Sequence, residues 1–293
     1  MRPFLCLIAL TVLFACGESK SQITPPPHGS VRIATHNVHY IVLDQATGTW
    51  SVGDWEDRKE SADQAFKALD ADIVAFQEME SFGRGDTDNI NLHRDWLLQN
   101  NPDYAAGANG DSAVFPSTQP IFYRTARFEM LDQGWFFFSD TPDVIYSRTF
   151  NGSYPAFASW VQLRDRNDGK TLTIYNVHFE FSSGSNRLLS AELTVDRMAP
   201  RLAAGERVVL TGDLNALRSF RTAQIFKDAG FTFAPVPGST YHLNRGINLF
   251  GAIDHLAASG PVSLIGEPQV LRRKFDGRWP SDHYPVIGDF VLR

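Results

Sequence analysis

Six short segments rich in acids, amides and histidine recur along this chain, each at the end of an apolar run. They are Thr35-His36-Asn37-Val38, Gln77-Glu78, Asn176-Val177-His178, Gly212-Asp213-Leu214-Asn215, Ile253-Asp254-His255 and Ser281-Asp282-His283. An apolar strand that ends in such a segment can deliver polar side chains to the edge of a sheet, where several strands bring them together. Because Asn, Asp, Glu and His bind hard cations and carry protons, the pattern predicts a metal-dependent site that cleaves phosphate esters.

The periodicity of apolar residues indicates one α/β domain from Val31 to the end of the chain. Strands are expected at residues 31–35, 72–76, 120–124, 128–138, 156–163, 171–177, 207–210, 252–253 and 286–292, and helices at 56–70, 88–99, 185–203 and 219–229. Residues 103–118 are expected to be an irregular loop. Since helices alternate with strands early and late, and hairpins lie between, we expect two mixed sheets packed as a sandwich with helices outside.

The N-terminus is expected to be a targeting segment. Arg2 precedes an apolar stretch from Phe4 to Phe14, which is too short to span a bilayer as a helix. Leu13-Phe14-Ala15-Cys16-Gly17 is similar to the cleavage box of bacterial lipoproteins, which would anchor the chain through Cys16. An ordinary secretory signal that contains a cysteine is the alternative, and lipidation is favoured over it.

These features predict three parts: a signal peptide over residues 1–16, a flexible linker over residues 17–30 with a run of prolines, and a domain over residues 31–293. The protein would be exported and held at the cell envelope, at the outer membrane or in the periplasm. Both cysteines, Cys6 and Cys16, lie in the targeting segment, so the domain cannot be stabilised by disulfides despite export. We expect a monomer.

The first candidate residues are an acid and an acid–amide pair. Glu78 follows a strongly apolar strand, where a carboxylate must be paired or coordinated. It is either a Mg²⁺ ligand or a structural acid paired with an arginine such as Arg58. Asp213 and Asn215 are two residues apart, so on an extended segment both side chains share one face. They would orient a water molecule and hold a phosphate oxygen, or form an Asx-turn.

An acid next to a histidine marks the last motif. Asp282 offers a metal ligand and His283 an imidazole that faces a phosphate, and Asp254 can bond the other ring nitrogen of His283 and keep the ring cationic. An exposed turn before Pro285 is the alternative. In the context of the other five motifs, the functional interpretation is favoured.

The remaining candidates are single residues. His178 is a second catalytic imidazole or a hydrogen-bonded core histidine, and Asn37 contacts metal or phosphate or caps a turn. His242, in Thr240-Tyr241-His242, and Arg124, at the end of a predicted strand, are candidates for binding substrate. Asn176 is expected to support the edge. The other histidines are expected to be structural, with His39 closest to the motifs: His28, His36, His39, His93 and His255.

The chain resembles the DNase I-like endonuclease/exonuclease/phosphatase superfamily over residues 31–293, because its motifs follow the order found in that family. The resemblance implies a four-layer α/β/β/α sandwich, one or two Mg²⁺ or Mn²⁺ ions, and hydrolysis of a phosphate ester. It also implies roles. Glu78 resembles the principal metal ligand, and Asn37 and Asp282 would lie near the metal. Asp213 resembles the group that orients or deprotonates the attacking water, and Asn215 resembles a phosphate ligand. Asp254 and His283 resemble an orienting pair, and His178 resembles the imidazole of nuclease members.

Charge bears on the substrate. The formal net charge is −6, and Arg272-Arg273-Lys274 is a lone compact basic run, so tight non-specific binding to nucleic acid is disfavoured. A phosphodiesterase or phosphomonoesterase acting on a small or lipid-linked ester is therefore favoured. A DNase-like nuclease is the first alternative. A non-catalytic, lipid-anchored binding module with the same fold is the second, although the complete set of acids, amides and histidines argues against it.

Overall fold

The computed structural model describes residues 23–83 and 90–293. The predicted signal peptide and cleavage box lie outside this part of the chain. Within it, no helix has the length and apolar character needed to cross a membrane.

Two six-stranded sheets form the centre of the domain, and both are mixed. The first sheet has, in spatial order, β13 (Val262–Val270), β14 (Val286–Leu292), β1 (Val31–Asn37), β3 (Ile73–Gln77), β6 (Ile121–Arg124) and β5 (Tyr104–Gly107). The second has β11 (Thr232–Phe233), β12 (Asp254–Ser259), β10 (Val208–Asp213), β9 (Thr171–His178), β8 (Phe157–Asp165) and β7 (Phe128–Phe137). The short strands β2 (Ile41–Val42) and β4 (Ser81–Phe82) pair beside them.

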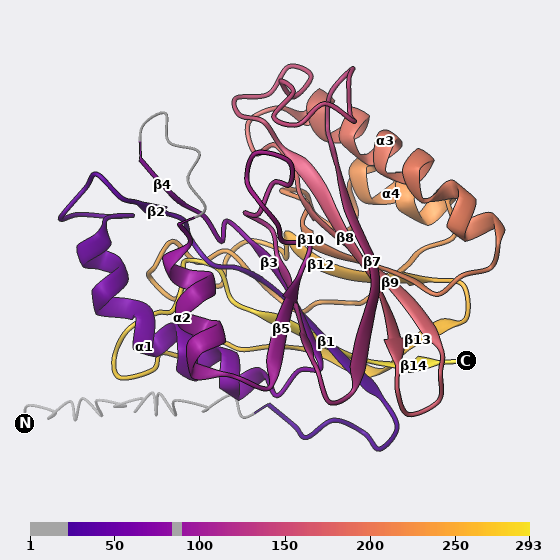
Figure 1. Cartoon of the computed structure of the whole chain (residues 1–293), viewed down its shortest axis with the longest axis horizontal. Coiled ribbons are helices and arrows are strands. Elements are labelled where there is room, and N and C mark those ends of the chain that lie inside the picture. Colours follow the sequence, from indigo (N-terminus) through magenta and orange to yellow (C-terminus); the bar gives the residue numbers. More distant parts are fainter. Residues whose placement is uncertain (1–22, 84–89) are drawn as a thin grey trace, which may run out of the picture.

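The helices lie on the outer faces of the two sheets (Figure 1). α1 (Val52–Leu69) and α2 (Leu92–Asn100) cover the first sheet, where Phe66 and Leu69 pack with Phe76 and Phe122. α3 (Gly184–Ala203) and α4 (Arg221–Asp228) cover the second, where Phe226 packs with Leu210. This confirms the predicted four-layer α/β/β/α sandwich.

The main core lies between the sheets. Ile33 and Ile73 from the first sheet pack in one cluster with Ile174, Val209 and Leu256 from the second. These clusters draw only on residues from Ile23 onwards, so a chain that begins at Ile23 retains the whole described core.

The strand period of two explains where the polar motifs lie. In β10, Val209 faces the other sheet, so Asp213, four residues later, also faces it. The same count places Asn37, Gln77 and His178 between the sheets, at the ends of parallel-paired strands. β12 runs antiparallel to β10, and its first residue, Asp254, pairs with Asp213. The motifs therefore meet at one end of the sandwich, which we call the site edge.

Strands occur in one predicted loop and in one segment without a prediction, and residues 23–30 are bonded to the folded domain. β5 lies in the predicted loop 103–118, and β13 was not predicted because a bulge near Gly266 and Pro268 interrupts its alternation. Residues 23–30 are not detached: the Thr24 amide donates to Gln269 Oε1 (2.8 Å), and the Arg32 guanidinium donates to the Thr24 carbonyl (2.7 Å). The described part of the predicted linker thus has two hydrogen bonds, through Thr24, to the folded domain.

Candidate active site

Asn37 joins the two sheets at the site edge. Its amide nitrogen donates to Glu78 Oε1 (3.0 Å), which follows β3, and lies 3.3 Å from Asp213 Oδ2, at the end of β10. Its amide oxygen accepts the His39 N–H (3.3 Å). Asn37 thus holds the carboxylates of both sheets in one cluster, with its nitrogen rather than its oxygen turned toward them.

A buried amide pair beneath this cluster fixes the distance between the sheets. The side chain of Gln77 donates to Asn176 Oδ1 (2.6 Å), and Asn176 donates in turn to the Phe76 carbonyl (2.7 Å). Both side chains are fully buried. Asn176 therefore supports the edge, as predicted, and Gln77, which lies in one of the six motifs but had no predicted role, supports it too.

Asp254, His283 and Asp213 form a buried chain of charged groups. Asp254 Oδ2 lies 2.9 Å from His283 Nδ1, and His283 Nε2 lies 3.9 Å from Asp213 Oδ2. Burial alone would lower the pKa of His283, but the charge and hydrogen bond of Asp254 outweigh it and raise that pKa to about 10. Burial would raise the pKa of Asp254, yet the His283 charge holds it below its usual value. His283 is thus a cation at neutral pH.

Asp213 is a buried carboxylate that faces both imidazoles of the cluster, His178 and His283. Burial and then the charge of Asp254 raise the pKa of Asp213 to about 6, against the opposing pull of His283 and His178. Its Oδ1 accepts the Asn215 N–H (2.7 Å), so the predicted Asx-turn is present. Its Oδ2 remains directed at the imidazoles. A carboxylate with this pKa is ionised near neutral pH and can accept a proton.

Two backbone features keep these carboxylates in place. Gly212 pairs with Val177, and a Cβ at Gly212 would lie 2.0 Å from the Val177 carbonyl oxygen, so only glycine fits before Asp213. Glu78 and Asn215 both have left-handed backbones, with φ of 55° and 45°. Such strain costs about 1–3 kcal/mol at each non-glycine residue and persists where surrounding contacts enforce it.

His178 and Asn215 flank the same point. His178 Nε2 lies 3.8 Å from both Glu78 Oε1 and Asp213 Oδ2. The Asn215 side chain donates to the Phe179 carbonyl (2.8 Å), which ties the loop after β10 to the loop after β9. The structure therefore brings His178 into the cluster, while the amide nitrogen of Asn215 is engaged by the backbone.

The last motif approaches from the first sheet. Asp282 Oδ1 lies 3.5 Å from His39 Nδ1. Burial raises the pKa of Asp282, but the hydrogen bond from His39 and the charge of His283 hold it well below the usual value. Ser281 Oγ donates to the Asn37 carbonyl (2.7 Å) and fixes this segment against β1. His39, expected to be structural, thus sits beside a proposed metal ligand.

Arg58 does not pair with Glu78. Its guanidinium donates to the carbonyls of Val38 (2.9 Å), His39 (2.7 Å) and Pro280 (2.9 Å), and its Nε to Asp54 (3.3 Å). This buried cation from α1 clamps the loop after β1 to the segment before Asp282. The pattern of the sequence gave no signal for that role, because the partners are backbone atoms.

The structure separates two candidates from the group. His242 is fully buried, with its ring 4.0 Å from that of Tyr284, so it does not face the cluster. Tyr241 lies there instead, 4.9 Å from the His283 ring. Arg124 pairs with Asp70 (2.7 Å) at the opposite end of the sandwich, because β6 runs antiparallel to β3. The proposed substrate contacts of His242 and Arg124 are therefore corrected.

The donor set suits a hard divalent cation. The side chains of Glu78 and Asp282 are 25% and 21% exposed, so their carboxylates can reach an ion at the surface of the cluster. Asp213, Asp254 and His283 also form a group whose ligand atoms lie within 4.8 Å of one another. Both ring nitrogens of His283 face carboxylates there, so an ion that binds in this group would have to displace a proton from the imidazole. We therefore favour Glu78 and Asp282 as the ligands.

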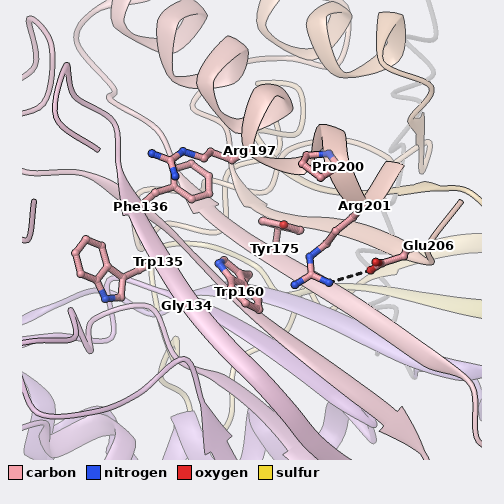
Figure 2. Close-up of a pocket in the computed structure, with 9 residues that line it drawn as sticks. All are labelled: Gly134, Trp135, Phe136, Trp160, Tyr175, Arg197, Pro200, Arg201 and Glu206. Atoms are coloured by element: carbon pink, nitrogen blue, oxygen red, sulfur yellow. Dashed lines mark hydrogen bonds and ion pairs between the residues drawn. The ribbon is translucent and has the colours of Figure 1, made fainter. Parts of the chain in front are cut away.

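A hollow of about 470 Å³ lies away from this cluster, on the outer face of the second sheet beside α3 (Figure 2). The Trp160 ring packs on the backbone of Gly134, where a Cβ would lie 2.6 Å away. Arg201 covers the same ring at 4.9 Å and pairs with Glu206 (2.9 Å). Since these groups already satisfy one another, the hollow lacks the free polar groups that define a site.

A two-sheet sandwich with acids, amides and imidazoles converging at one edge defines a DNase I-like phosphoesterase fold. The endonuclease/exonuclease/phosphatase family model matches residues 34–283, and the chain belongs to this family. Members of the family are hydrolases of phosphate esters that generally use a divalent metal. No curated protein sequence matches the chain.

Solved structures confirm the fold. An endonuclease/exonuclease/phosphatase family protein of Bacteroides thetaiotaomicron has a TM-score of 0.75 at 23% identity, covering 92% of this chain and 100% of the other. The mannosyl-6-phosphatase Bt3783 of the same organism has a TM-score of 0.74 at 23% identity, covering 89% and 100%. D. rerio TDP2 complexed with a single-strand DNA product has a TM-score of 0.62 at 17% identity, covering 89% and 98%. At these identities the likeness concerns the fold alone.

Proposed function

We propose that this protein is a divalent-metal-dependent hydrolase of phosphate esters at the cell envelope. The observation that carries the proposal is the convergence of two sheets on one cluster: Asn37 bonds Glu78 and lies within reach of Asp213, and His178 lies 3.8 Å from both carboxylates. The His283 cation faces Asp254 and Asp213, whereas Glu78 and Asp282 lie toward the surface of the cluster, where a divalent ion would offset their charge.

Glu78 and Asp282 would hold Mg²⁺, or Mn²⁺ as the alternative ion, with Asn37 aligning Glu78. When bound, the ion would supply charge neutralisation for the non-bridging oxygens and for the leaving oxygen. The two carboxylates leave room for water and substrate oxygens, which Mg²⁺ usually retains.

The chain's own residues supply the rest of the chemistry. Asp213 orients the attacking water and takes its proton as the new oxygen–phosphorus bond forms and the bond to the leaving oxygen breaks. His283, kept cationic by Asp254, donates from Nε2 to a phosphate oxygen. His178 offers a second imidazole to the same phosphate, and Asn215 would hold a phosphate oxygen after release from the Phe179 carbonyl.

A phosphodiesterase or phosphomonoesterase reaction on a small or lipid-linked ester is the favoured reaction. The net charge of −6 supports this choice over nucleic acid, and the likeness to a mannosyl-6-phosphatase adds hexose 6-phosphates to the substrates worth testing. The likeness to TDP2 with its DNA product keeps a DNase-like nuclease as the alternative. Export and lipidation at Cys16 remain part of the proposal and rest on residues 1–17 alone.

The test is a substrate panel with Mg²⁺ and with chelator. It should contain DNA, RNA, sphingomyelin, inositol phosphates, hexose 6-phosphates and nitrophenyl esters. We expect Mg²⁺-dependent turnover of a non-nucleic ester, and Glu78→Gln should lower it by at least about 10²-fold with an unchanged Tm. Glu129→Gln, at an exposed pair with Arg164, is the matched control. Full activity of Glu78→Gln at saturating Mg²⁺ refutes the metal assignment, and inactivity on every substrate favours the non-catalytic binding module.

A further inference from the structure

Exposed apolar side chains gather at one end of this molecule. Eleven large hydrophobic side chains are exposed among the described residues. They are Trp50, Ile90, Val114, Val144, Tyr146, Phe181, Leu189, Phe220, Leu243, Leu249 and Phe250. Ten lie in loops that leave the sheets at the site edge, and Leu189 lies in the second turn of α3, which starts there. Exposed apolar residues scattered at random would occur at both ends of the sandwich rather than gather at the site edge.

Five of these side chains frame the candidate active site, and we call them the apolar rim: Trp50, Phe181, Phe220, Leu249 and Phe250. Leu249 is 81% exposed and Phe181 67%. Phe181 lies three residues after His178, and Phe220 five residues after Asn215. Trp50 stacks on Tyr40 (5.5 Å between ring centroids) on the side of the first sheet. The rim therefore flanks the cluster on both sides.

The rim is held in place by its loops. The Phe250 amide donates to Ser239 Oγ (2.6 Å), and the Ser239 amide donates to Asn248 Oδ1 (2.6 Å), which pins the turn that carries Leu249. A Cβ at Gly251 would lie 2.6 Å from Leu217, so this turn packs against the loop that carries Phe220. These hydrogen bonds and contacts hold the turn in a conformation that exposes Leu249 and Phe250 to solvent.

We propose that the apolar rim docks on the surface of a lipid bilayer and sets the active site at the lipid–water interface. Aromatic and aliphatic side chains on several separate loop tips suit a fluid surface, which needs no shape complementarity. Arg218 and Arg245, both exposed, lie in the loops of Phe220 and Leu249, where their long side chains can reach head-group phosphates. Because the chain carries a net charge of −6, a zwitterionic surface fits better than an anionic one.

The start of the described chain is compatible with this orientation. Thr24 is hydrogen-bonded to Gln269. Gln269 pairs with Ile287, and Ile287 pairs in turn with Ala34, which lies three residues before the end of β1. That is roughly 10 Å below the site edge at about 3.3 Å per residue. Thr24 is eight residues after Cys16, and a chain of eight residue steps can span at most roughly 28 Å. A lipid on Cys16 could therefore share one bilayer with the rim.

Site-specific probes test the orientation without any readout of activity. The chain from Ile23 to Arg293 retains the described core and has no cysteine, so Leu249→Cys and Asn167→Cys each place one label. Asn167 is exposed in the hairpin between β8 and β9, at the opposite end of the sandwich. With vesicles of phosphatidylcholine that carries brominated acyl chains, the label at position 249 should be quenched and the label at position 167 should not.

A double variant distinguishes docking through the apolar rim from non-specific adsorption to the vesicles. Phe181→Ser with Phe220→Ser should weaken partitioning into the vesicles by about tenfold or more while leaving Tm unchanged, because it removes two rim side chains at a distance from the label. The proposal is overturned if neither label is quenched at excess lipid, or if both are quenched equally. It is also overturned if the chain sediments as a dimer without vesicles and shields the label at position 249, which would make a second copy the occupant. None of these outcomes depends on whether the hydrolase proposal is correct.

Discussion

Replacing Asp254 with asparagine tests whether Asp254 keeps the His283 ring protonated. Asp254 Oδ2 lies 2.9 Å from His283 Nδ1, and the pKa of His283 is raised to about 10 from an ordinary 6.5. Each pKa unit corresponds to about 1.4 kcal/mol, so roughly 4–5 kcal/mol favours the charged ring in the folded protein. Burial opposes this, and Asp254 is the largest favourable contribution.

Asp254→Asn keeps the shape and removes the charge. We expect the pKa of His283 to fall by at least about two units, because Asp213 and Asp282 contribute less than Asp254. At pH 9 most of the rings would then be neutral, and kcat/KM should drop by about tenfold or more, in proportion to the protonated fraction. At pH 6 the ring would be protonated in both proteins, so the two rates should converge.

The assay combines an NMR titration of the histidine ring signals with pH–rate profiles on the substrate found in the panel. Asp289→Asn is the matched control, since Asp289 is a buried acid paired with Arg32 (2.7 Å) far from His283. It should lower stability without moving the titration of His283. The reasoning fails if His283 still titrates near pH 10 in Asp254→Asn, or if the rate loss is the same at pH 6 and pH 9.

Two further predictions concern stability. Arg58→Met should lower the free energy of unfolding in urea by about 3 kcal/mol or more, because three buried carbonyls lose their donor; a loss below about 1 kcal/mol would contradict the clamp. In the presence of chelator, His283→Gln should be less stable than the natural protein at pH 6. Because the folded pKa of His283 is raised, its contribution is fully present below about pH 6.5 and is lost as pH rises through about 10, so the two unfolding curves should approach one another there. A stability difference that grows with pH would show the opposite sign and exclude the ion pair as its source.

Local sequence patterns predicted much of the fold because most strands here are buried and end in polar motifs. β3 and β10 were predicted as strands because each contains an apolar run that is followed within a few residues by an acid, Glu78 or Asp213. β13 was missed because it is an edge strand with Pro268 and a bulge, and such strands owe their existence to a partner rather than to local pattern. The predicted start of α1, residue 56, lies four residues after its first residue, Val52, because Ser51 caps the helix well before the apolar stripe that begins at Ala62.

The site shows the same division between local and long-range information. Asp254, His283 and Asp213 could be predicted as a group because each closes or opens an apolar strand. The amide bridge of Gln77 and Asn176 could not, because it depends on the distance between two sheets. His242 was a wrong choice for a comparable reason: its neighbour Tyr241 faces His283, and a one-residue step reverses the face on which a side chain lies.

The most direct test of the central claim is the effect of bound Mn²⁺ on the histidine NMR signals. If one divalent cation sits between Glu78 and Asp282, the paramagnetic ion should broaden the ring signals of His178 and His283 and leave that of His28 sharp. Glu78→Gln should abolish the broadening at the same Mn²⁺ concentration. Saturable binding that leaves His178 and His283 sharp would place the ion elsewhere and contradict the account.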